Sequence, residues 1–129
     1  MDELKHSNEL ENGEVQISDE VVSTIAGLAA TDIEGVAGMS GGFAGGISDM
    51  LGRKNLSKGV KVEVEGNEVK SDLYIIVKYG AKIPDVAWRI QESVKEAITN
   101  MTGLKVTEVN IHVQGVQLEH EKSEEDEEA

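Results

Sequence analysis

The sequence predicts an α+β fold of two layers, in which two helices cover one face of a mostly antiparallel sheet. Val60, Val62 and Val64 alternate with charged residues, which indicates a strand with one buried face. Two other segments carry apolar residues at spacings of three and four, as amphipathic helices do. The expected order is β-α-β-loop-β-β-α-β. Because each element has one apolar face to bury, we expect the helices to pack on the sheet.

The first half of the body is expected to contain a short strand, a helix and a second strand. Val15 and Ile17 alternate with polar residues, which predicts the short strand. The helix is predicted over residues 19–32, because Ser18 has the side chain of a helix N-cap. Residues 35–39 are a short apolar run that predicts the second strand. The apolar face of the helix is expected to consist of Val22, Ile25, Ala29 and Ile33.

The second half gives a clearer pattern. After the strand at residues 60–64, the turn Gly66-Asn67 leads into a second alternating run over residues 69–79, which predicts a β-hairpin. Pro84 fits the first turn of a second helix, and a glycine at position 103 fits its end. The apolar stripe of this helix is expected to consist of Ala87, Ile90, Val94, Ala97, Ile98 and Met101.

The last strand is predicted over residues 104–118. Its alternation shifts parity between Val106 and Val109 and again at Gly115, which indicates two β-bulges. The sheet face away from the helices is expected to be polar, either a solvated surface or an interface. It would carry Lys61, Glu63, Asp72, Tyr74, Lys78, Asn110 and His112.

The net charge of −13 over 129 residues is unevenly distributed. Residues 119–129 hold seven acidic side chains and one lysine, with nothing apolar to bury in the run at 124–128, so we expect a disordered tail. We expect an acidic arm over residues 1–13, one domain over 14–118 and the acidic tail over 119–129. No stretch is long and apolar enough to span a membrane, and the acidic start does not resemble a signal peptide. We therefore expect a cytoplasmic protein.

The residue types required for catalysis or metal binding do not form a recognisable pattern. There is no cysteine, and His6, His112 and His120 have no metal-ligand spacing, so no metal or cofactor is predicted. The glycine-rich segment at 41–46 lacks the lysine of a phosphate-binding loop. It contains a GxxG pattern as in KH domains, which leaves RNA clamping open beside a partner-binding or connecting loop. The sequence therefore predicts no enzyme.

Two surface features are candidates for partner binding. A run of four cations with no acid between them reverses the local charge of an acidic protein, and it either contacts an anionic partner or attracts the acidic arms. Trp88 lies on the helix side opposite the apolar stripe, and exposed tryptophans are enriched in interface hot spots. The alternative for Trp88 is packing under a neighbouring loop. With the aromatic residue of the glycine loop, the candidate partner-binding residues are Phe43, Arg53, Lys54, Lys58, Lys61 and Trp88.

Over residues 13–118 the sequence resembles the alkaline shock protein family, the Gls-type envelope stress response proteins of Gram-positive bacteria. The resemblance lies in the segments ISDEVV at 17–22, IEGV at 33–36, GVKV at 59–62, LYIIVKYG at 73–80 and VNIHVQGV at 109–116. The glycine loop at 41–46 and residues 52–54 resemble the YqhY-like branch.

The resemblance implies a cytoplasmic protein without known enzymatic activity, linked to envelope stress. It further implies a membrane anchor protein as a possible partner, or a link to fatty-acid synthesis through acetyl-CoA carboxylase. Three functions stay open: a scaffold or regulatory module that binds protein partners and itself, a nucleic-acid-binding module that uses the glycine loop and residues 53–61, and a small enzyme or ligand binder. The acidic balance argues against nucleic acid.

Overall fold

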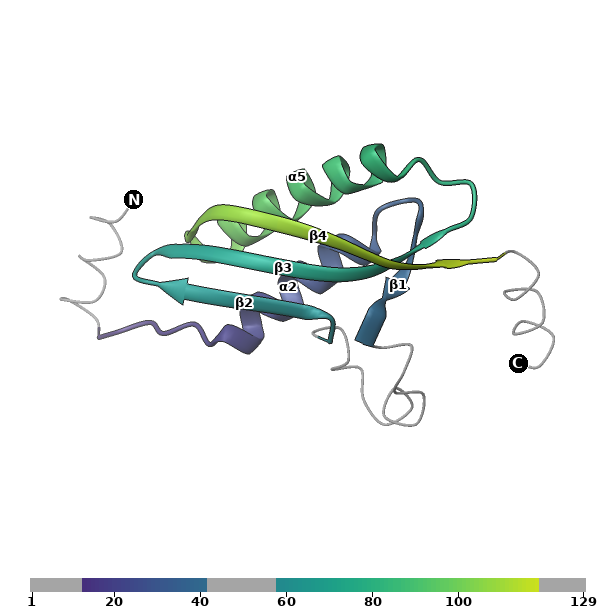
Figure 1. Cartoon of the computed structure of the whole chain (residues 1–129). Coiled ribbons are helices and arrows are strands. Elements are labelled where there is room, and N and C mark those ends of the chain that lie inside the picture. The colour runs from purple at the N-terminus through teal and green to yellow at the C-terminus, as the bar shows by residue number, and fades with distance from the viewer. Residues whose placement is uncertain (1–12, 42–57, 119–129) are drawn as a thin grey trace.

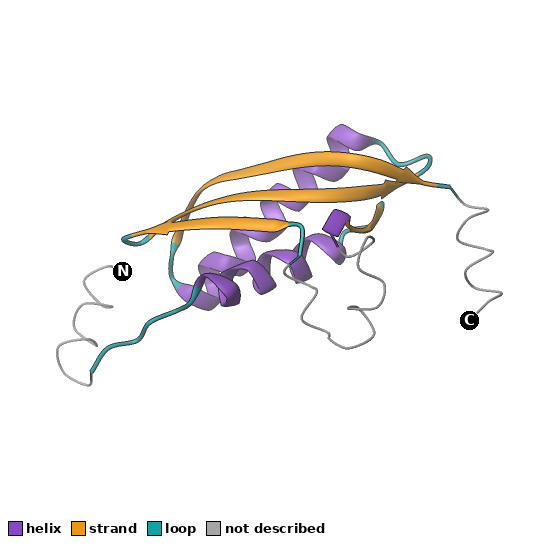
Figure 2. Ribbon diagram, turned by 60° about the horizontal axis from the view of Figure 1, so that its bottom comes forward, coloured by secondary structure: helices purple, strands orange, loops and turns teal. Residues whose placement is uncertain are grey.

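The computed structural model describes residues 13–41 and 58–118. Within them the predicted fold class is confirmed: two helices lie on one face of an open, mostly antiparallel sheet (Figure 2). The elements, labelled in Figure 1, are α2 (Asp19–Thr31), β1 (Val36–Met39), β2 (Val60–Glu65), β3 (Glu68–Lys78), α5 (Ile83–Thr102) and β4 (Lys105–Gln117).

The strand predicted around Val15 and Ile17 is wrong, because residues 13–18 have no regular structure. Val15 is 66% exposed. No strand of the described residues pairs with this segment. An alternating pattern of two apolar residues forms a strand only where a neighbouring strand offers backbone hydrogen bonds.

The sheet is organised around β3, which pairs on both sides. On one side β4 runs parallel to β3 over its whole length, from Glu68 opposite Lys105 to Lys78 opposite Gln117. On the other side two shorter strands share β3: β2 pairs antiparallel with its first half, and β1 pairs antiparallel with residues 75–77. The parallel pair requires a crossover, and α5 supplies it.

Both bulges predicted in the last strand are confirmed. The register between β3 and β4 shifts twice, and the residues left unpaired in β4 are Thr107 and Gln114. The second shift precedes Gly115, where an added Cβ would lie 3.1 Å from the Cδ1 atom of Ile76. A glycine at this position therefore lets a side chain of β3 lie across β4.

The first helix begins as predicted. The Ser18 hydroxyl accepts a hydrogen bond from the Val21 amide at 3.3 Å, which makes it the N-cap. The buried face is rotated slightly from the expected one, because small residues allow α2 to approach the sheet closely. Ala29 and Ile33 are only partly buried. The apolar residues of α2 in the core are Val22, Ile25, Ala26 and Ala30.

The second helix has the predicted ends, with Pro84 in its first turn and Gly103 as a left-handed C-cap at φ 79°. The core stripe differs from the prediction at Met101, which is 70% exposed. Met101 has the helical phase of the stripe, but it lies in the last turn beside a groove between the helices. The buried residues follow an i, i+4 row: Val86, Ile90, Val94 and Ile98. Neither helix of the described residues is long and apolar enough to cross a membrane.

Truncation of the α5 stripe tests this packing. Ile98 is fully buried, so Ile98→Ala removes core contacts and leaves a cavity, and we expect a loss of about 2–5 kcal/mol in the free energy of unfolding. Met101→Ala is the matched control on the same helix, and we expect it to change that free energy by less than about 0.5 kcal/mol. Urea unfolding followed by circular dichroism measures both. Equal losses would show that the stripe is placed wrongly.

Candidate functional site

The sheet face opposite the helices is covered by no other element of the described residues (Figure 2). The register places Lys61 of β2, Asp72 of β3 and Asn110 of β4 in one row across the three strands. The neighbouring row along β3 contains Tyr74 opposite His112. The prediction of a shared polar face is therefore confirmed for these five side chains. It is wrong for Lys78, which lines a groove with residues of α5 instead.

Four of these side chains form a connected group, which we call the open-face cluster: Lys61, Asp72, Tyr74 and His112. The rings of Tyr74 and His112 stack with centroids 4.4 Å apart and planes 12° apart. The Nε2 atom of His112 lies 3.0 Å from Oδ1 of Asp72. The ammonium nitrogen of Lys61 lies 5.7 Å from the centroid of the Tyr74 ring, a cation–π distance. The rigid strands thus hold a cation, an aromatic ring, an imidazole and a carboxylate side by side.

The electrostatics of the cluster are dominated by one contact. The hydrogen bond with His112 lowers the pKa of Asp72 below its usual value of 3.8, against a smaller opposing effect of desolvation. The side chains of His112 and Asp72 are 42% and 39% exposed, so water reaches both. The pair is therefore accessible to another molecule from solvent.

The end of β1 and the start of β2 meet directly beside Tyr74, at a point that we call the junction. The Tyr74 amide donates to the Gly59 carbonyl oxygen at 2.7 Å. Gly59 has φ +80°, and a Cβ placed there would lie 3.2 Å from Cβ of Met39. A Cβ at Gly41 would lie 3.1 Å from the Gly59 nitrogen. The chain therefore leaves β1 and returns to β2 at one point, next to the open-face cluster.

The structure brings together only part of the predicted partner-binding set. Lys61 belongs to the open-face cluster, and Lys58 is exposed just before the junction. Trp88 is 60% exposed, as its helical phase predicts, but it belongs to α5 in the other layer. The remaining candidates, Phe43, Arg53 and Lys54, lie outside the described residues, as do the glycine loop after Gly41, His6 and His120.

Two grooves escaped the sequence analysis, because each is formed by residues distant in the chain. The first lies between α2 and α5, has a volume of about 450 Å³ and is mainly apolar. Leu28 and Met101 line it and are 50% and 70% exposed. In the sequence their only signal is helical phase, which assigned Met101 to the core. We call this the helix-layer groove.

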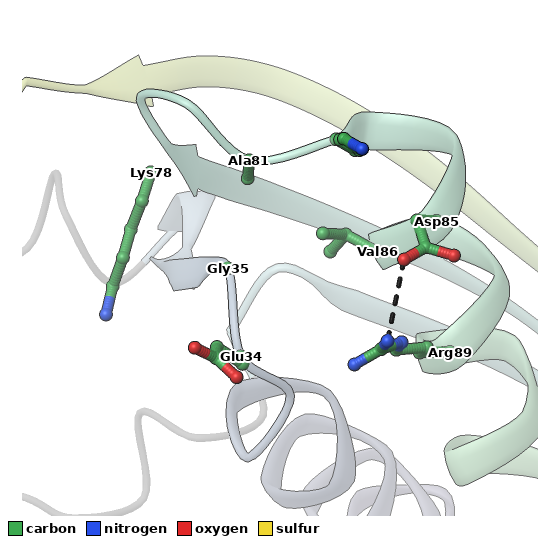
Figure 3. Close-up of a pocket in the computed structure, with 8 residues that line it drawn as sticks. Glu34, Gly35, Lys78, Ala81, Asp85, Val86 and Arg89 are labelled. Carbon is green, nitrogen blue, oxygen red and sulfur yellow. Dashed lines mark ion pairs between the residues drawn. The ribbon is translucent and has the colours of Figure 1, made fainter.

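The second groove, which we call the end groove, lies where β3 ends and α5 begins (Figure 3). It has a volume of about 310 Å³. Gly35 lines this groove and has a φ of +104°. A Cβ at this position would lie 2.8 Å from Cγ2 of Val86, which shows that the α2–β1 turn packs tightly on α5. The charged residues that line the end groove are Glu34, Lys78, Lys82, Asp85 and Arg89.

The described residues contain no cluster of three or more potential metal ligands. Asp72 and His112 are adjacent, but the neighbouring positions on the open face supply an aromatic ring and an ammonium group instead of a third ligand. A stable zinc site would need at least three protein ligands.

The chain matches the family model of the alkaline shock protein 23 family, described as having a cell envelope-related function, over residues 7–118. It is 42% identical to the YqhY protein of Bacillus subtilis over 107 residues, which are 83% of this chain and 79% of that protein. It is 43% identical to YloU of the same organism, covering 82% of this chain and 90% of that protein.

A stress response regulator, a gls24 homolog of Streptococcus pyogenes, is 35% identical over 78% of this chain and 57% of its own length. Among solved structures, a variant of the MamM C-terminal domain covers 78% of this chain and 86% of its own length with a TM-score of 0.54. Its sequence is 13% identical, so this likeness concerns the fold alone.

Titration of Asp72 tests the electrostatics of the cluster. Because its pKa is lowered in the folded protein, the carboxylate stabilises the fold above its usual pKa of 3.8, and this contribution is lost as pH falls through the folded value. We expect the carboxyl ¹³C signal of Asp72 to titrate below 3.8 in the native protein. In His112→Ala the midpoint should rise, because the largest cause of the lowering is removed. An unchanged midpoint in that variant would contradict the assignment.

Proposed function

The chain belongs to the alkaline shock protein 23 family, whose function is cell envelope-related, and from this premise we propose that it is a non-catalytic scaffold or regulatory protein. It acts through protein–protein contacts in cell-envelope homeostasis. Residues 14–118 form the domain that makes these contacts, with acidic arms on either side. The similarity to a protein described as a stress response regulator supports a regulatory role.

The observation that carries the proposal is the open-face cluster on an uncovered sheet. Each side chain in it is held by a neighbour: His112 by Asp72 and Tyr74, and Tyr74 in turn by Lys61. Side chains that are ordered before binding lose less conformational entropy when a partner docks. Tyrosine supplies contact area, and the surrounding charges of both signs supply specificity.

The predicted partner contacts Phe43, Arg53 and Lys54 are attached to the same site. Residues 42–57 start and end at the junction formed by Gly41 and Gly59, and Gly59 is hydrogen-bonded to Tyr74. Together with Lys58 and Lys61, which the structure describes, they make up the proposed partner-binding residues in this part of the sequence. Loops that are held at a rigid sheet commonly carry binding residues.

Trp88 forms a separate contact on the helix layer, and the protein self-associates there. Trp88 is 60% exposed on α5, and Leu28 and Met101 are exposed at the helix-layer groove, so the helix layer offers apolar contact area to a second copy. One face then remains for the partner and the other for a second copy. The partner is a membrane anchor protein or acetyl-CoA carboxylase, as the family resemblance implies, and the protein acts in the cytoplasm or at the inner face of the membrane.

The open face is tested by affinity purification of the tagged protein from gently crosslinked cells. A Lys61→Ala, His112→Ala variant removes two members of the open-face cluster, both at least partly exposed. We expect it to weaken recovery of the partner by about tenfold or more, because interface hot spots contribute at least about 1.4 kcal/mol each. The recovered protein, anchor or carboxylase, identifies the pathway.

The matched control is Glu92→Ala, Lys95→Ala, which changes two exposed charged residues on the outer surface of α5. It should recover the partner as the native protein does, and circular dichroism should show both variants folded. Equal recovery by the native protein and the open-face variant would move the interface elsewhere. Recovery of RNA alone would favour the nucleic-acid-binding alternative.

A further inference from the structure

The end groove contains an excess of positive charge in an acidic protein. Its cations are Lys78, Lys82 and Arg89, and its carboxylates are Glu34 and Asp85. Arg89 and Asp85 pair with each other at 3.5 Å, as the dashed line in Figure 3 marks. Within the described residues neither Lys78 nor Lys82 forms an ion pair, and both are exposed. Two ammonium groups at this groove are therefore available to an external anion.

The described part of β4 ends beside this groove. Gln117 is the register partner of Lys78, and the Tyr79 amide donates to the Gln117 carbonyl oxygen at 2.9 Å. The connection from β3 to α5 then continues through Ala81 and Lys82, which line the groove. Adjacent strands lie about 4.8 Å apart, so the chain leaves the described structure within one strand spacing of the groove wall.

The residues that follow have the complementary charge. Residues 119–129 contain seven acidic side chains and one lysine. We propose that the end groove binds this acidic segment of its own chain, with carboxylates paired to Lys78 and Lys82. The segment then lies over the β3–α5 connection and occupies the groove until another acidic sequence competes for it.

The length of the segment allows the contact. The acidic run at residues 124–128 begins six residues after Leu118 and can reach about 20 Å or more, because an extended chain spans about 3.3–3.6 Å per residue. Tethering gives the segment an effective concentration in the mM range at the groove. A contact with a Kd of about 1 mM is therefore about half occupied, although the same peptide added at low concentration would not bind.

The contact is electrostatic and must weaken with salt. Raising the ionic strength from about 0.01 M to about 1 M shortens the Debye length from about 30 Å to about 3 Å. The seven acidic side chains also repel one another and the acidic body, and the cations of the end groove offset part of the cost of holding them close. This explains why the end of β4, and not the open face with its mixed charges, is the expected place.

Paramagnetic relaxation enhancement tests the proposal on the full chain. The sequence contains no cysteine, so Ser123→Cys gives a single site for a nitroxide label. At low salt we expect a strong loss of intensity for the amide signals of Gly35, Ala81 and Lys82, because the bound segment holds the label close to them. The amide of Gly66, at the other end of β3, is the internal reference, about 30 Å or more along the strand. At about 1 M salt the loss should decrease to the level that a tethered but unbound label causes.

Charge variants assign the effect to the groove. Lys78→Gln, Lys82→Gln in the labelled chain should reduce the loss to the same level as high salt does, whereas Lys95→Gln, Lys105→Gln, which removes the same charge elsewhere, should leave the loss unchanged. All four lysines are exposed, so the variants should keep the native amide spectrum outside the substituted positions.

Three outcomes overturn the proposal. The first is no selective loss at the groove signals relative to Gly66. The second is equal loss in the two charge variants. The third comes from mixing an unlabelled ¹⁵N chain with a nitroxide-labelled ¹⁴N chain: loss of the ¹⁵N groove signals in this mixture would show that the segment of a second copy is the occupant. None of these outcomes depends on the partner that the open face binds.

Discussion

The fold depends on β3, the strand that is paired on both sides and buried on one face. Every second residue of β3, from Val69 to Val77, has a side chain that is at most 1% exposed. These side chains meet the stripes of α2 and α5, while the backbone holds three other strands in register. A one-residue slip of β3 would move this row of apolar side chains to the open face, so the pattern fixes the register of the whole sheet.

The same alternation creates the candidate site. The residues between the buried ones, Asp72 and Tyr74, must point away from the helices, and the parallel pairing with β4 places His112 beside them. The site is thus a consequence of core packing on the opposite face. Its charges and rings are positioned by strands, which are more rigid than loops, although the segment at residues 42–57 is attached immediately next to it.

The sequence predicted the features that depend on local chemistry. Alternation located the hairpin and the open face, Ser18 and Gly103 located helix ends, and parity shifts located both bulges. Features that depend on contacts between residues distant in the sequence could not be predicted. Residues 13–18 have a strand pattern but pair with no strand of the described residues, and Met101 has core phase but lines a groove between the helices. The two grooves and the stacked pair join residues far apart in sequence, so no local pattern indicates them.

The junction at Gly41 and Gly59 has a consequence for how such proteins can diversify. Because the chain departs from and returns to nearly the same point, the ends of the intervening segment are already closed on each other by the sheet. Doubling the length of a loop with fixed ends costs only about 0.6 kcal/mol of closure entropy. Insertions, deletions or wholly different sequences can therefore be exchanged between β1 and β2 while the sheet stays unchanged. The domain is in this sense a frame for an exchangeable segment, suited to the grafting of other sequences in the laboratory.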